Sequence, residues 1–274
     1  MKTQRSTFEA DWAGWHQRHE ELRAGPHGFL AITGRHWLTP EPRRSGDAPG
    51  AWSAADDTVT VTLDDDEELA VDGEPVHGTY TFAPIPERGQ VMATSGDAAI
   101  EVARRGGHLI VRPRHPGHPT RTGYAGTPAY APDPRWVIEG RYLPYDEPRD
   151  VTVGAVVEGL QHVYEAPGEL EFAVDGRTLR LTAFNGRTPG SLHVLFTDAT
   201  SGVTTYPANR SLEVAAPDAD GAVTLDFNHA VNLPCAYTEF ATCPLPPAGN
   251  QLPVAVEAGE KMPREQHPPA GRVP

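Results

Sequence analysis

The chain has 274 residues, which is enough to bury a sizeable hydrophobic core without a disulfide framework or a structural metal. Its 23 Lys and Arg against 37 Asp and Glu give a formal net charge of −14, and this charge repels nucleic-acid phosphates and anionic lipid. The opening residues, "MKTQRSTFEADWAGW", contain no apolar signal-peptide core, and no apolar run reaches the roughly 18 residues of a membrane span. With only two cysteines, we expect a cytoplasmic protein with reduced thiols that binds neither nucleic acid nor membranes.

The first predicted element is a helix over residues 7–24. Ser6 is followed three positions later by Glu9, which is the spacing of a capping box. Hydrophobic side chains recur at helical intervals along one stripe, formed by Phe8, Trp12, Trp15 and Leu22. Gly25 and Pro26 then end the helix. Because the stripe would otherwise expose two indole rings, we expect residues 1–27 to form a clasp on the rest of the fold, with a lid or a dimer contact as the alternative.

From residue 28 onward the hydrophobic period changes to two, which is typical of half-buried strands. The predicted strands are residues 58–63, 79–82, 99–103, 108–112, 136–143, 151–157, 169–174, 178–184, 191–198 and 222–227. Asp175 and Gly176 lie between two of them and indicate a hairpin. No helical segment separates the strands, so the sequence predicts a mainly β fold: an antiparallel sandwich or barrel-like body over residues 28–262, with one N-terminal α-helix.

Two segments interrupt this pattern. Residues 113–134 are rich in Pro and Gly, and a connection of more than about 15 residues is usually functional, lies at a subdomain junction or is disordered. We expect it to mark a division of the β-rich domain into two lobes. Residues 263–274 are predicted to be a disordered tail.

The stretch "DFNHAVNLPCAYTEFATCPLPP", residues 226–247, raises the question of whether it is a site or an irregular wall. Its prolines remove backbone donors and resist ladder pairing, so the freed backbone groups need other partners. Asp226, Asn228, Asn232 and Asn250 could supply them from inside the fold. Alternatively, the same side chains face a cavity and orient a polar ligand. We expect the stretch to line a pocket while it also closes one end of the barrel.

Several motifs resemble those of a bacterial family known as domain of unknown function 1684. The motifs are "LFTDATSGVTTY", then Arg210, and then "DFNHAVNLPCAYTEFATCPLPPAGNQLPVAVEAGEK" near the C-terminus. The N-terminal helix with its tryptophans and "GFLAITGRHWL" extend the resemblance over nearly the whole chain. Where family members usually carry Lys or Arg, this chain has His229, and His115 replaces an acid. The resemblance implies no established activity, and the two histidines suggest a specialised member.

The residues expected to carry chemistry gather near this C-terminal motif. His229 is the predicted proton carrier because an imidazole titrates near neutral pH, with Asp226 or Asp198 orienting it. Arg210 presents a planar fork that suits a carboxylate, so it is a predicted ligand clamp, or else it forms an internal ion pair with one of those two aspartates. The other predicted ligand-binding residues are Asn228, Asn232, Cys235, Tyr237, Arg112 and Arg121.

Neither a metal nor an organic cofactor is predicted. Cys235 and Cys243 are too far apart for typical zinc ligands, so we expect buried thiols, with a local disulfide or a nucleophilic Cys235 as alternatives. His115 and His118 could join His229 and a carboxylate in an open metal site, but loop histidines beside prolines are more often exposed. The sequence contains no glycine-rich phosphate loop, dinucleotide-binding fingerprint or paired-histidine metalloprotease motif.

Three functions fit these observations. The favoured one is an enzyme that acts on a small polar or anionic metabolite by acid–base chemistry, and hydrolase, lyase and isomerase are not separable. The alternatives are a non-catalytic carrier of a small ligand and an interaction module that docks through the N-terminal helix, because β-barrels host all three.

Overall fold

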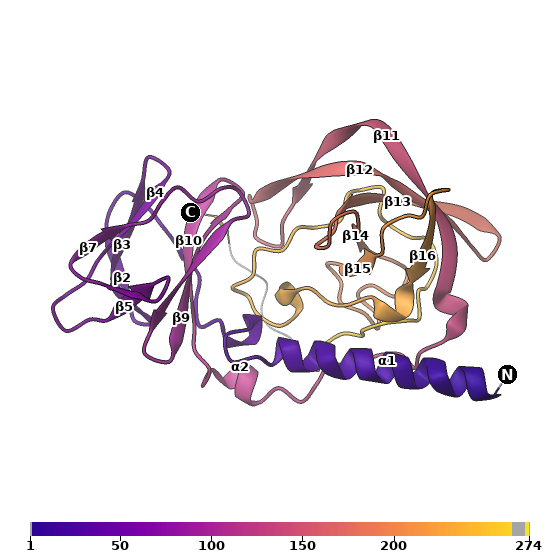
Figure 1. Cartoon of the computed structure of the whole chain (residues 1–274), viewed down its shortest axis with the longest axis horizontal. Coiled ribbons are helices and arrows are strands. Elements are labelled where there is room, and N and C mark those ends of the chain that lie inside the picture. Colours follow the sequence, from indigo (N-terminus) through magenta and orange to yellow (C-terminus); the bar gives the residue numbers. More distant parts are fainter. Residues whose placement is uncertain (1, 265–271, 274) are drawn as a thin grey trace. The chain divides into compact units, whose positions relative to one another are not determined.

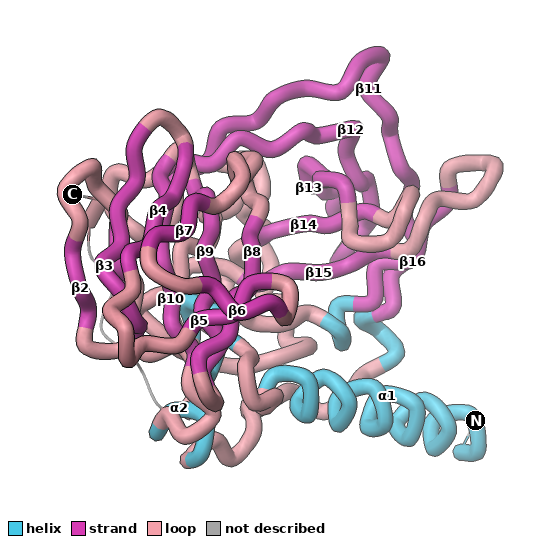
Figure 2. Tube along the Cα trace, turned by 60° about the vertical axis from the view of Figure 1, so that its left-hand side comes forward, coloured by secondary structure: helices cyan, strands magenta, loops and turns pink. Residues whose placement is uncertain are grey.

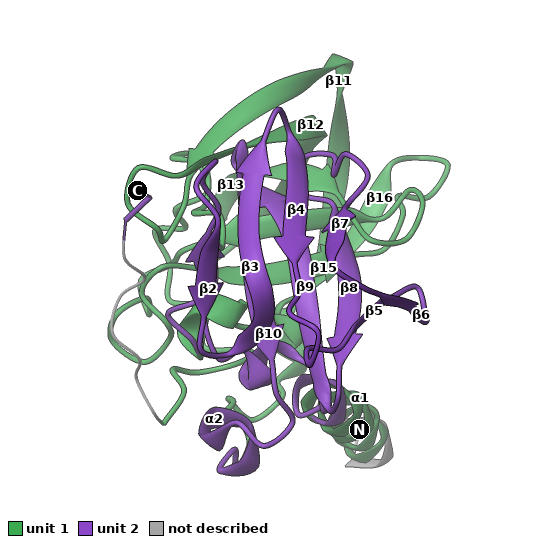
Figure 3. Ribbon diagram, turned by 90° about the vertical axis from the view of Figure 1, so that its left-hand side faces the viewer, with its two compact units in different colours: residues 1–20, 126–237, 243–267 green, residues 21–125, 238–242, 268–274 purple. Residues whose placement is uncertain are grey.

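The computed structural model describes residues 2–264 and 272–273, so most of the predicted tail lies outside the described residues. The predicted mainly β fold with an N-terminal helix is confirmed, since three antiparallel sheets follow helix α1 (Lys2–Arg23) (Figures 1 and 2). The chain divides into two compact units (Figure 3). Unit 1 comprises residues 1–20, 126–237 and 243–267, and unit 2 comprises 21–125, 238–242 and 268–274. The junction near residue 125 lies within the Pro/Gly-rich connection. None of the described helices is long and apolar enough to cross a membrane.

Unit 2 contains two antiparallel sheets. One has the order β1-β10-β9-β8-β5-β6 and the other β2-β3-β4-β7. Their strands are β1 (His36–Trp37), β2 (Arg43–Ser45), β3 (Ala48–Ala55), β4 (Thr58–Thr62), β5 (Leu69–Val71), β6 (Glu74–Val76), β7 (Thr79–Thr81), β8 (Gln90–Ser95), β9 (Ala98–Arg105) and β10 (His108–Arg114). Alternate residues of both sheets, such as Trp52 and Val61 opposite Ile100 and Val102, form one buried core, so this unit is a sandwich (Figure 3). The short helices are η1 (Phe29–Ala31) and α2 (Pro119–Thr122).

Unit 1 is built on one antiparallel sheet with the order β15-β14-β13-β12-β11-β16. Its strands are β11 (Val137–Gly154), β12 (Gln161–Val174), β13 (Arg177–Asn185), β14 (Leu192–Phe196), β15 (Arg210–Val214) and β16 (Ala222–Asp226), and its short helices are η2 (Pro134–Trp136), η3 (Phe227–His229) and η4 (Pro234–Ala236). The sheet curves over the irregular C-terminal segment (Figure 1). Phe227, Leu252, Val254 and Val256 of that segment pack into the same core as the sheet, so the segment fills the inside of an open half-barrel.

Strand β11 joins two segments that the sequence separates. Residues 136–143 and 151–157 were predicted as different strands, but β11 runs from Val137 to Gly154 and pairs with β12 on both sides of an irregularity. The register shifts between Pro144 and Arg149. Pro144 and Pro148 explain the shift, because proline in a strand removes a ladder donor and is tolerated at a bulge.

Helix α1 packs on the rest of unit 1 through its tryptophans. It begins at Lys2, so Ser6 lies inside the helix and the predicted capping box does not form its start. Trp12 and Trp15 are half-buried, and the indole N–H of Trp12 donates to the backbone oxygen of Asn228 at 2.9 Å. Leu22 is 78% exposed, so it does not continue the buried stripe. The contact with unit 1 therefore comes from the middle of the helix.

We expect Trp12→Ala to lower the free energy of unfolding by about 2 kcal/mol, because it removes a half-buried indole and one hydrogen bond. Trp12→Phe should lose less, since it keeps most of the ring. Chemical denaturation at neutral pH measures both, and Leu22→Ala is the control, with an expected change within about 0.5 kcal/mol. If Trp12→Ala unfolds like the control, the helix is not docked through this ring.

Candidate functional site

Two asparagines of the C-terminal segment bind backbone groups. Asn228 accepts from the backbone N–H of Asp133 at 2.8 Å and donates to its oxygen at 3.0 Å. Asn250 accepts from the N–H of Thr182 at 2.8 Å and donates to the oxygens of Thr182 and Leu195. Each side-chain amide thus bonds backbone groups that lack a neighbouring strand, which is the structural role expected from the sequence. Asn228 was also predicted to contact a ligand, but its side chain is bonded to the backbone of Asp133 instead.

Arg210 forms the internal ion pair that the sequence offered as the alternative to a ligand clamp. Its side chain is 1% exposed, and Nη2 lies 2.8 Å from Asp198 Oδ2. The guanidinium also donates to the backbone oxygens of Val256, Ala258 and Glu260. Asp198 Oδ1 accepts from the backbone and the hydroxyl of Thr200. Both charges are therefore committed to the fold, and we do not retain Arg210 or Asp198 as ligand-binding or catalytic groups.

Arg112, just before the 113–134 connection, and Arg121, within it, also have internal partners, all in unit 2. Arg112 lies opposite Glu101 in the β9–β10 ladder and donates to it through Nε and Nη2 at 3.0 and 2.5 Å. Arg121 donates to the backbone oxygens of Ala24, Gly25 and Pro116. Neither guanidinium is placed as the anion clamp that the sequence predicted.

His229 lies at the end of η3, where the strand gives way to an irregular turn. Its Nδ1 is 3.6 Å from Asp226 Oδ2, and its ring centroid is 4.1 Å from that of Trp15. Asp226 Oδ1 accepts from the backbone and the side-chain amide of Asn228, so the carboxylate is fixed. Burial lowers the pKa of His229 below its usual 6.5, and Asp226 opposes that shift. Of the two aspartates that the sequence offered as partners of His229, the structure places Asp226 beside it.

A second polar group surrounds Glu260, whose side chain is 1% exposed. Its Oε2 accepts from the backbone N–H of Asn232 at 2.7 Å and from the hydroxyl of Tyr237 at 3.3 Å. The Tyr237 hydroxyl in turn lies 2.8 Å from the hydroxyl of Thr127. Residues 128–130 hold the segment that carries Glu260, through bonds such as Tyr130 N to Gly259 O. The predicted residues Asn232 and Tyr237 thus meet at a carboxylate that the sequence did not single out.

One face of α1 completes this group. His16 and Glu20 are four positions apart and therefore share a helix face. Together with Glu260 they offer three ligand atoms that all lie within 4.8 Å of one another. Nε2 of His19 lies 3.8 Å from Glu260 Oε1, and its ring stacks on Trp15 with centroids 5.4 Å apart. We call His16, His19, Glu20, Thr127, Asn232, Tyr237 and Glu260 the Glu260 cluster.

Residues 122–261 match the sequence profile of a family described as "Protein of unknown function (DUF1684)", and this match spans just over half of the chain. The chain belongs to this family. A solution NMR structure of the uncharacterized protein from gene locus rrnAC0354 of Haloarcula marismortui is 33% identical and covers 52% of this chain and 78% of that one, with a TM-score of 0.43. None of the curated proteins matches. The DUF1684 match includes Glu260 and His229, whereas α1 precedes it.

The cysteines of the DUF1684 segment are both buried thiols. The backbone N–H of Cys235 donates to Cys243 Sγ at 3.3 Å. Interaction with the Cys243 thiol and burial raise the pKa of Cys235 well above its usual value. A nucleophilic cysteine needs the opposite shift, so the buried-thiol interpretation fits and neither the disulfide nor the nucleophile does.

The loop histidines make local contacts in unit 2. His115 Nδ1 accepts from the backbone N–H of Gly117, and His118 Nδ1 lies 3.2 Å from the oxygen of Leu30. Among the described residues, the group of converging metal-type ligands is the one on α1 and Glu260. The signals for it were the i, i+4 pair in "HQRHE" and the acid in "AGEK", but nothing in the sequence connects them.

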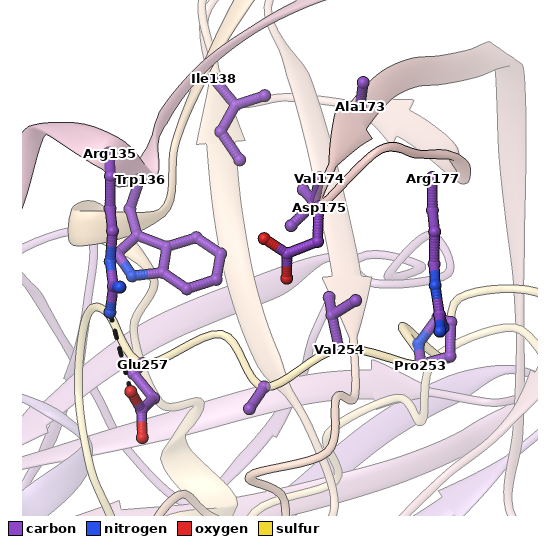
Figure 4. Close-up of a pocket in the computed structure, with 11 residues that line it drawn as sticks. Arg135, Trp136, Ile138, Ala173, Val174, Asp175, Arg177, Pro253, Val254 and Glu257 are labelled. Carbon is purple, nitrogen blue, oxygen red and sulfur yellow. Dashed lines mark ion pairs between the residues drawn. The ribbon is translucent and has the colours of Figure 1, made fainter.

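Unit 1 also has an open pocket of about 570 Å³, and neither His229 nor any residue of the Glu260 cluster lines it. Figure 4 shows Arg135 and Trp136 on one side of it, Arg177 on the other and Asp175 between them. Arg135 lies 3.7 Å from Glu257 in the same wall. The pocket combines two cationic and two anionic side chains on a partly apolar floor.

The buried Glu101 yields a test of acid stability. Burial by itself would raise its pKa, but Arg112 and Arg114 outweigh burial and bring the pKa to about 2. Because this lies below the usual 4.5, the stabilisation is full above that pH and is lost as the pH falls towards 2. We expect Glu101→Gln to cost on the order of 3 kcal/mol at pH 7, a difference that shrinks through the acid range. Urea denaturation at several pH values measures it, with the exposed Glu74→Gln as control. An equal loss at pH 7 and in acid would contradict the ion pairing.

Proposed function

We propose that this DUF1684 protein is an enzyme that acts on a small polar metabolite by acid–base chemistry, with His229 as its proton carrier. The observation that supports this is the setting of His229, which lies between the fixed carboxylate of Asp226 and the ring of Trp15. Its side chain is 36% exposed, so a solute can reach the ring. A carboxylate beside one imidazole nitrogen fixes the orientation of the ring and leaves the other nitrogen for proton transfer.

The charge state suits a general base. Burial keeps the pKa of His229 below 6.5, so the ring is mostly neutral at neutral pH. Nε2 makes no hydrogen bond to the residues that the structure describes, and it is therefore the nitrogen that would take a proton from a bound substrate. Asp226 stabilises the charged ring that results. Proton transfer of this kind serves hydrolases, lyases and isomerases alike.

The charged residues of the chain favour a polar substrate over a strongly anionic one. The three arginines considered as anion clamps have partners within the protein. The neighbouring Glu260 cluster instead offers amide, hydroxyl and carboxylate groups. With a net charge of −14 the whole protein repels polyanions. We infer a small cytoplasmic metabolite that carries hydroxyl, amide or amine groups.

His229→Gln should slow turnover by about 10²–10⁴-fold, the usual contribution of a general base. The assay is depletion of compounds from a defined mixture of sugars, amino acids, amides and lactones, followed by mass spectrometry. Activity should rise as the pH increases through the pKa of His229. Asp226→Asn removes the group that raises this pKa, so the acid limb should move to lower pH. The exposed His27→Gln is the control. Depletion by wild type and His229→Gln at equal rates would sink the proposal, and so would no depletion at all.

The open pocket at Arg135 and Arg177 supports a second candidate, a carrier of a small zwitterion. Its two cationic and two anionic side chains suit a ligand that carries both a positive and a negative charge. NMR titration with a mixture of free amino acids should shift the amides of the β12–β13 hairpin, and Arg177→Gln should weaken binding about tenfold, as loss of a charged hydrogen bond does. Arg141→Gln, outside the pocket, is the control. Shifts that avoid this hairpin, or equal binding by Arg177→Gln, would rule the carrier out.

A further inference from the structure

We propose that His16, Glu20 and Glu260 form a binding site for one divalent transition-metal ion. The three ligand atoms lie within 4.8 Å of one another and come from two segments far apart in the chain. A metal at about 2.0–2.2 Å from each nitrogen or oxygen needs ligand separations of about 3–4 Å, so small side-chain rotations complete the set. This site goes beyond the proposed function, because neither His229 nor Asp226 takes part in it.

Each ligand is oriented by a second group, as is usual for metal ligands. Glu20 Oε2 accepts from the backbone N–H of Thr127 at 3.0 Å. Glu260 Oε2 accepts from the N–H of Asn232 and the hydroxyl of Tyr237. The ring of His16 stacks on Trp12 with centroids 4.8 Å apart and planes 17° from parallel. These contacts hold the side chains so that they face one another.

A buried acceptor in the same cluster is a separate observation that points to a ligand. Asn232 is 4% exposed, and its Oδ1 is buried with no hydrogen-bond partner among the described residues. A buried amide oxygen without a partner is energetically unfavourable, and a water bound to the metal would satisfy it. The helix face also gives access, because His16 and Glu20 are only half-buried while Glu260 is buried.

The donor set indicates the kind of ion. One imidazole and two carboxylates suit zinc, manganese or ferrous iron, whereas calcium and magnesium prefer oxygen ligands alone. Three protein ligands leave at least one position for water or substrate, which is the pattern of catalytic sites. The cysteine spacing and the loop histidines indicated no metal in the sequence, and neither feature involves His16 or Glu20. His19, 3.8 Å from Glu260, stands next to the site as an outer group.

The test is metal binding by the full chain, purified without a polyhistidine tag, stripped with a chelator and titrated with Zn²⁺ or Mn²⁺ by calorimetry. We expect one ion per chain, and a loss of affinity of at least about 100-fold in His16→Gln and Glu20→Gln. Tyr237→Phe should weaken binding about 10-fold, in the range for outer groups. Glu21→Gln, the same change at an exposed position of α1, should bind like the wild type. Thermal unfolding of each variant shows that it is folded.

His229→Gln separates this proposal from the preceding one, because it should keep its metal while losing activity. A cobalt-loaded wild type should show an absorption band that Glu20→Gln lacks and Glu21→Gln retains. Failure of the wild type to bind Zn²⁺ or Mn²⁺ at micromolar concentration would overturn the proposal. Equal binding by His16→Gln, Glu20→Gln and the control would also overturn it, since the ions would then lie elsewhere on the acidic surface.

Discussion

The buried pair of Arg210 and Asp198 is the interaction on which unit 1 depends. Their side chains are 1% and 0% exposed, and removing two charges from water costs several kcal/mol each unless every donor and acceptor finds a partner. Here most of them do, because Arg210 also binds three backbone oxygens between Val256 and Glu260. Burial lowers the pKa of Arg210 and Asp198 opposes the shift, so the pair stabilises its own charged state.

The same arginine explains how a segment without strand pairing can fill the inside of a sheet. Leu252, Val254, Val256 and Ala258 bury their side chains in the core, but residues 252–258 belong to none of the strands of the sheet, so their carbonyl groups need other donors. Arg210, on the edge strand β15, supplies them, and Asn250 does the same for β13 and β14. The chain then reaches Gly259 and Glu260 in a fixed position. Gly259 has a φ of +72°, and a Cβ there would meet the oxygen of Ala230 at 2.4 Å, so this approach requires glycine.

Sequence reasoning reached the fold class, the family and the staple role of the asparagines, because each depends on local pattern or motif. It missed strands such as β1 and β2, which are only two or three residues long, and also β3, β8 and β15, which are five to eight residues long. It could not choose between Asp198 and Asp226 as the partner of Arg210, since both follow strands of the same predicted sheet. The sequence could not show that His16 and Glu20 lie beside Glu260. A helical period shows which residues share a face of the helix, but it does not show what that face contacts.

Within unit 1, the DUF1684 segment and helix α1 contribute different side chains. Arg210, Asn228 and Asn250, whose side chains bond backbone oxygens, belong to the segment that matches DUF1684. His229 and Glu260 belong to the same segment. Helix α1 lies before that segment, and it brings Trp15 against His229 and His16 and Glu20 beside Glu260. A substitution on this face of α1 would therefore alter the proposed sites without removing the Arg210–Asp198 pair. The helix expected as a clasp therefore does two things: Trp12 packs it on the rest of unit 1, and its neighbouring side chains reach both of the proposed sites.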